Sequence, residues 1–287
     1  MACLAGGALG APEVRARADS AGDVAIQELR GARGAIEAVV CTPAHLAAGE
    51  RAPLLVLLHG LAETADARVG AYAWVERYGL VGAYERLRRP PLRNVGRRVD
   101  WSDTALAAAN RALAARPFRG LVIACPFVPR DAGGPSLAAF ARWVARDLVP
   151  RVRSLAMVDA GATSIDGCSF GGYIALETFL RYPDVFAAWG GVQSAIGRDR
   201  AAGYAARLEA VVKSAGAPRP LHVETSTADA FREGNEALAA ELARRGVPHD
   251  LTLLPGPHDQ PWLRESGTAA MLLWHDALTR SAAPRTP

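Results

Sequence analysis

The sequence predicts an α/β fold with a mostly parallel central sheet, an N-terminal antiparallel hairpin and helices on both faces of the sheet. Two observations lead to this prediction. Short apolar runs without alternating polar residues recur along the chain, which is typical of strands buried on both faces of a parallel sheet. Between them lie segments with apolar residues at three- and four-residue spacing, which is typical of amphipathic helices. Because strands alternate with helices of crossover length, we expect right-handed crossovers and a sheet covered on both sides.

The elements follow in this order. Two strands, Val24–Leu29 and Ala35–Cys41, flank a segment that contains Gly31 and Gly34, and this pattern predicts a hairpin. Further strands are expected at the apolar runs 52–60, 120–126, 162–168, 221–225 and 250–254. Helices are expected at 137–152, 173–181, 233–245 and 268–278.

The size and composition indicate one large domain. The chain has 287 residues, half of them hydrophobic and 22% charged, which excludes a disordered chain and a disulfide-stapled miniprotein. We expect a single domain over residues 22–280, because no repeat or linker divides it. Residues 1–21 are expected to be a flexible leader or the remnant of an export signal, for which residues 16–18 offer a small-x-small cleavage site. Both a cytoplasmic and an exported protein therefore stay open.

The segment from Leu61 to Pro117 is the least regular part of the sequence. Connections of this length usually carry a function or hold a small insert. It contains six closely spaced arginines: Arg86, Arg88, Arg89, Arg93, Arg97 and Arg98. Two interpretations are open, a solvated surface loop or a lid or rim that attracts acidic substrates.

Charge and motifs exclude several classes of partner. The 33 basic and 29 acidic residues give a net charge of +4, and Lys213 is the only lysine. A small, scattered surplus does not indicate a nucleic-acid partner. No apolar run is long enough for a membrane span. The four cysteines form no Cys-x-x-Cys pair, and neither a His-Glu-x-x-His nor a Gly-x-Gly-x-x-Gly motif is present, so no metal and no cofactor is expected.

One pentapeptide carries the main chemical signal. Residues 167–171 read Gly-Cys-Ser-Phe-Gly and match the pattern Gly-x-Ser-x-Gly. A buried-strand run precedes Ser169 and a helical pattern follows it, and such a sharp turn exposes a serine hydroxyl at the carboxyl edge of a sheet. Ser169 is therefore the candidate nucleophile, with a Gly-rich structural turn as the alternative.

A serine hydroxyl needs a base to act as a nucleophile. Of the four histidines after Ser169, only His258 lies in the loop directly after the last predicted strand, on the edge where Ser169 emerges. His222 and His275 fall inside a predicted strand and helix, and His249 precedes the last strand. His258 is therefore the expected base.

The base in turn needs a carboxylate that orients it. Asp229 lies past the carboxyl end of the strand at 221–225 and is the expected acid, with a role as helix N-cap as the alternative. Glu224 lies within that strand, and Asp259 is adjacent to the histidine, so both are less suitable.

A developing oxyanion needs two backbone donors. The Phe170 amide follows the nucleophile at a helix N-terminus, where the helix dipole adds positive potential, and the Leu61 amide follows the first core strand. His59 and Trp262 are candidates for a substrate pocket, because they lie beside these motifs. Trp101 and Trp189 are weaker candidates, and core packing is the alternative for each tryptophan.

The sequence resembles a known family at three places. The runs 147–152 (Asp-Leu-Val-Pro-Arg-Val), 166–173 (around Ser169) and 182–186 (Tyr-Pro-Asp-Val-Phe) are similar to the "putative esterase" branch of the α/β-hydrolases. That branch includes esterase D-like, feruloyl-esterase-like and enterochelin-esterase-like enzymes and the mycolyltransferases. The resemblance covers about residues 50–278 and implies an α/β-hydrolase fold, a Ser-Asp-His triad and hydrolysis of carboxylic esters without a cofactor. Cys168, Ser226 and the arginine-rich insert depart from the usual pattern of the branch, so no subfamily substrate is implied.

These observations together predict a serine carboxylesterase that acts on a small-molecule ester through an acyl-enzyme. An acyltransferase with the same triad and a non-catalytic hydrolase-like scaffold are the alternatives. The acyl group, the alcohol and the oligomeric state are not indicated by the sequence.

Overall fold

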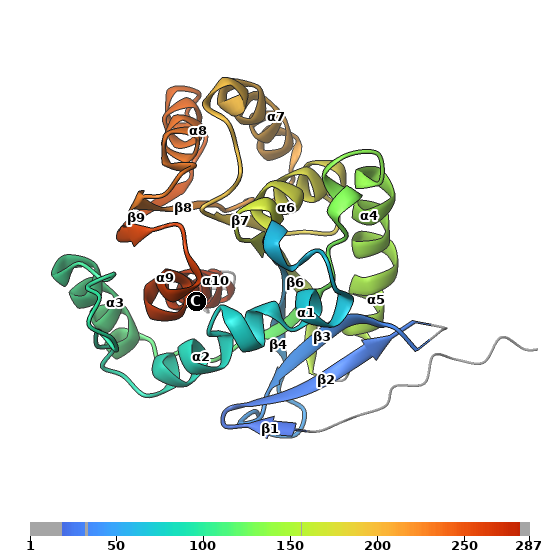
Figure 1. Cartoon of the computed structure of the whole chain (residues 1–287), viewed down its shortest axis with the longest axis vertical. Coiled ribbons are helices and arrows are strands. Elements are labelled where there is room, and N and C mark those ends of the chain that lie inside the picture. Colours follow the sequence, from blue (N-terminus) through green and yellow to red (C-terminus); the bar gives the residue numbers. More distant parts are fainter. Residues whose placement is uncertain (1–18, 32–33, 156, 282–287) are drawn as a thin grey trace, which may run out of the picture.

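The predicted fold class is confirmed by a mixed, mostly parallel sheet with helices on both sides (Figure 1). The computed structural model describes residues 19–31, 34–155 and 157–281; most of the predicted leader lies outside these ranges. The described strands form one nine-stranded sheet in the order β1-β2-β3-β5-β4-β6-β7-β8-β9. β1, β2 and β3 pair antiparallel, β3 pairs antiparallel with β5, and the remaining pairs are parallel.

The strand bounds agree with the apolar runs, with two additions. The strands are β1 (Asp19–Ala21), β2 (Val24–Arg30), β3 (Ile36–Pro43), β4 (Ala52–Leu58), β5 (Val122–Pro126), β6 (Val158–Gly167), β7 (Ala188–Val192), β8 (Leu221–Ala228) and β9 (Asp250–Pro257). β1 falls at the end of the segment expected to be a leader, where it pairs with β2. β7 was not predicted and completes the sheet between β6 and β8.

The helices include several that the sequence did not reveal. They are α1 (Ala67–Ala71), α2 (Leu80–Arg88), α3 (Asp103–Ala115), α4 (Leu137–Trp143), α5 (Val149–Arg153), α6 (Phe170–Arg181), α7 (Ala201–Ser214), α8 (Arg232–Arg244), α9 (Gln260–Trp262) and α10 (Thr268–Ser281). Short 3₁₀ or wider turns join some of them, including η1 (Leu61–Glu63) and η2 (Ala73–Arg77). The helix expected at 137–152 is α4 and α5, joined by a wider turn at 144–148. No described helix has the length and hydropathy needed to cross a membrane.

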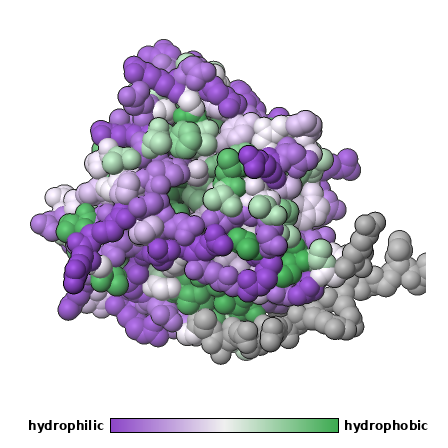
Figure 2. All heavy atoms as spheres, in the orientation of Figure 1, coloured by the Kyte–Doolittle hydropathy of each residue, from purple (hydrophilic) through white to green (hydrophobic). Residues whose placement is uncertain are grey.

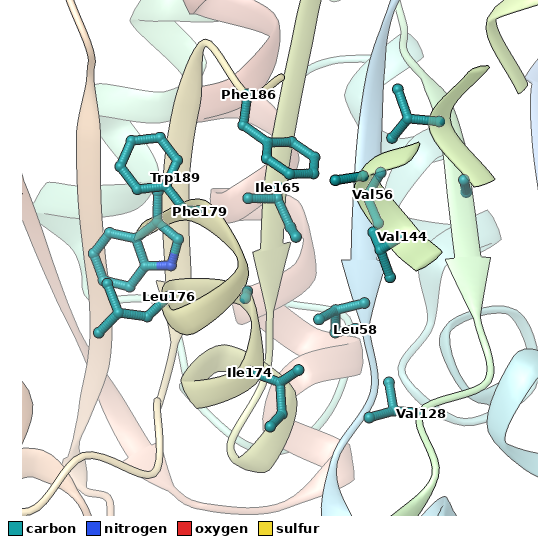
Figure 3. Packing of buried hydrophobic residues seen from close by; sticks show 14 of the residues in the cluster. Val56, Leu58, Val128, Val144, Ile165, Ile174, Leu176, Phe179, Phe186 and Trp189 are labelled. Carbon is teal, nitrogen blue, oxygen red and sulfur yellow. The ribbon is translucent and has the colours of Figure 1, made fainter. Parts of the chain in front are cut away.

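Alternate residues of the central strands pack into two separate cores. Leu54, Val56 and Leu58 of β4 face α4 to α8, whereas Leu55 and Leu57 face α1, α2, α3 and α10. Figure 3 shows part of the first core, with these labelled side chains from strands and helices in contact: Val56, Leu58, Val144, Ile165, Ile174, Phe179 and Trp189. Because both faces of β4 are buried, its sequence is a continuous apolar run.

The arginine-rich segment is folded onto the second core. Its helices α2 and α3 and the turn η2 cover the sheet beside α10 (Figure 1). Trp74, Tyr84 and Leu87 from this segment are fully buried. The interpretation of a solvated surface loop is therefore wrong for these elements, whereas residues 89–99 between α2 and α3 form a mostly exposed loop. The face seen in Figure 2 is mainly hydrophilic, with its hydrophobic residues in small separate groups.

The parallel topology places several loops at one edge of the sheet. The carboxyl ends of β4, β6, β7, β8 and β9 all lie on that edge, because these strands run in the same direction. They are followed by Gly60, Ser169, Gln193, Asp229 and His258 in that order. This edge is where ligands bind in open α/β sheets.

Candidate active site

Ser169 occupies the turn between β6 and α6 in a backbone conformation that L residues rarely adopt. Its φ is 54° and its ψ is −119°. Hydrogen bonds hold the turn: the Ser169 amide donates to the Val192 carbonyl (2.9 Å), and the Ser169 carbonyl accepts from Ala195 (2.9 Å). Both partners follow or end β7, so the strand that the sequence did not reveal fixes this turn.

The glycines around Ser169 allow the strand and the helix to approach closely. A Cβ on Gly171 would lie 2.3 Å from the Leu58 carbonyl oxygen, and one on Gly167 would lie 2.5 Å from the Gly171 backbone. Side chains at these positions would push α6 away from β4 and β6. The turn therefore requires glycine on both sides of the serine.

Asp229 and His258 are in direct contact. His258 Nδ1–H donates to Asp229 Oδ1 at 2.7 Å. The Asp229 carboxylate is buried and accepts two more hydrogen bonds, from Thr225 Oγ1 to Oδ2 (2.6 Å) and from the Phe231 amide to Oδ1 (2.9 Å). Three donors fix the orientation of this carboxylate, which leaves Nε2 of His258 as the basic nitrogen of the ring.

The two alternative carboxylates have other surroundings. Glu224 is fully buried in β8, and neither of its carboxylate oxygens has a hydrogen-bond partner among the described residues. Asp259 accepts from the Trp262 amide (2.8 Å) and pairs with Arg98 (2.8 Å). Neither carboxylate is bonded to His258 in the described part of the chain.

Gln193 supports the loop that carries His258, and sequence reasoning missed it. Gln193 is 2% exposed and has a φ of 46°, which is unusual for a residue other than glycine. Its Nε2 donates to Ser226 Oγ (2.6 Å) and to the Pro257 carbonyl (3.1 Å). It thus joins the ends of β7, β8 and β9. No motif marks it, because β7 itself was not predicted.

The two predicted oxyanion donors begin helical turns. Leu61 is the first residue of η1 and Phe170 is the first residue of α6. Within the described residues, neither backbone amide donates a hydrogen bond. A Cβ built on Gly60 would lie 3.8 Å from Ser169 Cβ, so the turn after β4 lies beside the serine.

The structure corrects the two predicted pocket residues, His59 and Trp262, because both are fully buried. The Val128 amide donates to His59 Nε2 (2.8 Å), so Nδ1 carries the proton and donates to the Gly60 carbonyl (2.9 Å). Burial lowers the pKa of His59 to about 4, which keeps the ring neutral at pH 7. Trp262 packs in the second core and donates to the Pro255 carbonyl (2.8 Å). Neither side chain has surface left for a substrate.

Trp101 and Trp189 are also core residues, at 3% and 0% exposure. Trp101 donates to the Glu265 carbonyl at 3.1 Å, and Trp189 packs in the first core. The packing alternative therefore holds for all three tryptophans considered.

Arginines of the insert form internal contacts. Arg98 pairs with Asp100 (2.9 Å) and with Asp259 (2.8 Å), next to His258. Arg86 donates to the Arg264 carbonyl (2.8 Å). These two side chains attach the insert to the loop after β9 and to the turn that follows it, and both are engaged with protein groups.

Comparison with known proteins agrees with this architecture. No curated protein matches the chain. A family model described as "Putative esterase" matches residues 124–272, which is more than half of the chain. The chain belongs to the esterase family. The match starts in β5, includes Ser169, Asp229 and His258, and ends in α10.

Solved structures with the same fold are similar to this esterase along almost its whole length. A ferulic acid esterase has a TM-score of 0.64 and 17% identity, over 89% of this chain and 98% of that chain. An S-formylglutathione hydrolase from Staphylococcus aureus has a TM-score of 0.59 and 16% identity, over 88% and 96%. An S-formylglutathione hydrolase from Agrobacterium tumefaciens has a TM-score of 0.55 and 17% identity, over 90% and 97%. At these identities the likeness shows the α/β-hydrolase fold.

Membership of the family identifies the chemistry as hydrolysis of small-molecule esters. In the described part of the chain, no group of three or more histidine, cysteine or acidic side chains is arranged to hold a metal ion.

Proposed function

We propose that this esterase is a serine carboxylesterase in which Ser169 is the nucleophile, His258 the general base and Asp229 the residue that orients the base. Ser169 Oγ attacks the ester carbonyl while His258 Nε2 takes the hydroxyl proton. The imidazolium then donates that proton to the leaving alcohol, and an acyl-enzyme remains. Water, activated by the neutral His258, releases the acid and restores the serine.

One observation carries this proposal above the others. The Asp229–His258 contact of 2.7 Å lies at the same sheet edge as a serine with a φ of 54°. A buried carboxylate that accepts from Nδ1 stabilises the imidazolium formed during attack. The strained turn presents the serine side chain at the N-terminus of α6. A structural serine would have no need of either arrangement.

The uncommitted amides of Leu61 and Phe170 support the same mechanism. Both are backbone donors without an acceptor in the described residues, and the turn that carries Leu61 lies beside Ser169. The tetrahedral intermediate places a negative oxygen where such donors stabilise it. We propose that these two amides form the oxyanion hole.

The proposal is tested by hydrolysis of p-nitrophenyl acetate and butyrate, together with labelling by a fluorophosphonate probe. Ser169→Ala should lower kcat/KM by a factor on the order of 10⁴ or more and should abolish labelling. Ser154→Ala is the matched control, because Ser154 is exposed and its hydroxyl bonds, within the described residues, only to the Arg151 carbonyl. Activity or labelling that survives in Ser169→Ala would refute the mechanism.

A further inference from the structure

Glu63 is a buried acidic residue in the turn that carries the Leu61 amide. It ends η1, and it is 2% exposed. Burying a carboxylate is unfavourable unless hydrogen bonds or charges compensate for the lost hydration. The proposed triad does not use this side chain, so its burial needs another explanation.

Two other segments of the chain contact the Glu63 carboxylate. The Tyr78 hydroxyl donates to Oε2, and Gln260 Nε2 donates to Oε1 at 3.1 Å. Arg77 Nη1 lies 3.6 Å from Oε1. Gln260 is two residues beyond His258, so this carboxylate joins the turn after β4 to the loop after β9.

Tyr78 extends the connection to the nucleophile turn. Its hydroxyl accepts from the Gly60 amide at 3.2 Å, and the Cys168 side chain lies nearby. Burial, with the nearby Cys168 and Glu63, raises the pKa of Tyr78, so the hydroxyl keeps the proton that it donates to Glu63. The backbone before Leu61 and the residue before Ser169 therefore both lie beside Tyr78.

We propose that Glu63 is a positioning residue for ester hydrolysis: it holds the Leu61 amide in a fixed place relative to Ser169 and His258. The proposal rests on the mechanism given above, in which that amide stabilises the oxyanion. Each carboxylate oxygen of Glu63 accepts one hydrogen bond, Oε2 from the Tyr78 hydroxyl and Oε1 from the Gln260 amide. Without it, the turn η1 loses its hydrogen bonds to both neighbouring segments.

The proposal predicts a specific kinetic change. An oxyanion donor acts in the transition state and contributes about 10²–10³ to kcat when it is correctly placed. A displaced donor loses part of that, so Glu63→Ala should lower kcat roughly 10- to 100-fold and change KM by less than about threefold. The matched control is Glu76→Gln, since Glu76 is exposed and its carboxylate forms an ion pair, among the residues that the structure describes, only with Arg68. It should keep wild-type kcat.

Two variants at the contact between Glu63 and Gln260 distinguish a positioning role from a general effect on stability. Gln260→Glu places two carboxylates face to face and should lower kcat about tenfold, because the like charges repel each other. Adding Glu63→Gln reverses donor and acceptor, so the double variant should recover most of the lost kcat. Gln260 is only half-buried, which makes this pair informative even if Glu63→Ala does not fold.

The measurement is kcat for p-nitrophenyl butyrate per site labelled by a fluorophosphonate, so that unfolded protein does not count. A kcat of Glu63→Ala within twofold of wild type, or no recovery in the double variant, would overturn the positioning role. Either result would leave the proposed function intact as long as Ser169→Ala is inactive. Activity retained by Ser169→Ala would refute the proposed function, and the positioning role with it.

Discussion

Replacing Ser169 by glycine should stabilise the protein while removing the proposed activity. The residue has a φ of 54° and a ψ of −119°, outside the regions open to residues with a Cβ. Such conformations cost about 1–3 kcal/mol and persist where the surrounding structure imposes them. The structure imposes this one through the hydrogen bonds from Ser169 to Val192 and from Ala195 to Ser169.

The expected magnitude follows from two opposing contributions. Glycine adopts this conformation without steric cost, which recovers about 2 kcal/mol. Glycine also loses more backbone entropy on folding, which costs about 0.5–1 kcal/mol. The net gain should be about 1 kcal/mol over Ser169→Ala, which lacks the hydroxyl but keeps the Cβ. In a domain of this size, that gain raises Tm by about 2–4 °C.

The assay is thermal and urea unfolding of Ser169→Gly and Ser169→Ala, followed by circular dichroism at one pH. Both variants lack the proposed nucleophile, so formation of an acyl-enzyme cannot cause the difference between them. If Ser169→Gly unfolds at the same temperature as Ser169→Ala or below it, the turn is not strained and the argument from backbone conformation fails.

Two further outcomes are expected. Asp229→Asn should lower kcat about 10⁴-fold with little change in KM, because an amide facing Nδ1 of His258 favours the wrong tautomer. Steady-state hydrolysis of p-nitrophenyl butyrate checks this, and more than about a hundredth of wild-type kcat would contradict it. Glu224→Gln should stabilise the protein increasingly as pH rises, because burial and the nearby Asp166 raise the pKa of Glu224 well above 4.5. Above pH 4.5, Glu224 loses its proton in the unfolded state but keeps it in the folded state. The free energy of unfolding of the wild type therefore falls by about 1.4 kcal/mol per pH unit relative to that of the variant. Urea unfolding between pH 5 and 7 measures the difference, and a constant difference would contradict the raised pKa.

The fold was predictable where a strand is buried on both faces. The apolar run of β4 has no polar interruption, and both faces of that strand are covered by helices. β7 was missed because two of its five residues are glycines, which are rare in strands. The structure explains one of them: a Cβ on Gly190 would lie 2.0 Å from Asp166 Oδ2. This contact crosses between neighbouring strands, so the local sequence contains no signal of it.

The insert was difficult to predict for a related reason. Its arginines suggested exposure to solvent, yet Arg98 pairs with Asp259, which lies 161 residues further along the chain. Trp74 and Tyr84 are buried against the sheet, and that packing requires the strands to be assembled first. Tertiary contacts of this kind decide whether a charged segment is exposed, and the local sequence does not reveal them.

The residues of the candidate site likewise fall into two groups, those that the sequence predicts and those that only the structure reveals. Ser169, Asp229 and His258 each follow a strand, and chain order together with the parallel topology is enough to bring them to one edge. Glu63 and Gln193 also lie after strands, β4 and β7, but no motif marks either residue and β7 itself was not predicted. Each becomes recognisable only when its side chain is found buried between loops that are distant in sequence.

The buried polar contacts at this edge also suggest how the loops keep their positions. Loops have few apolar side chains with which to pack against one another, so they need directional contacts to fix their relative placement. Glu63 connects the turn after β4 with Gln260 beyond His258, and Gln193 connects the end of β7 with Pro257, the last residue of β9. One contact is at Pro257, directly before His258, and the other is at Gln260, two residues after it. The histidine loop is thus held from two directions by hydrogen bonds. Small displacements of either partner should therefore affect the rate of the chemical step before they affect the stability of the fold.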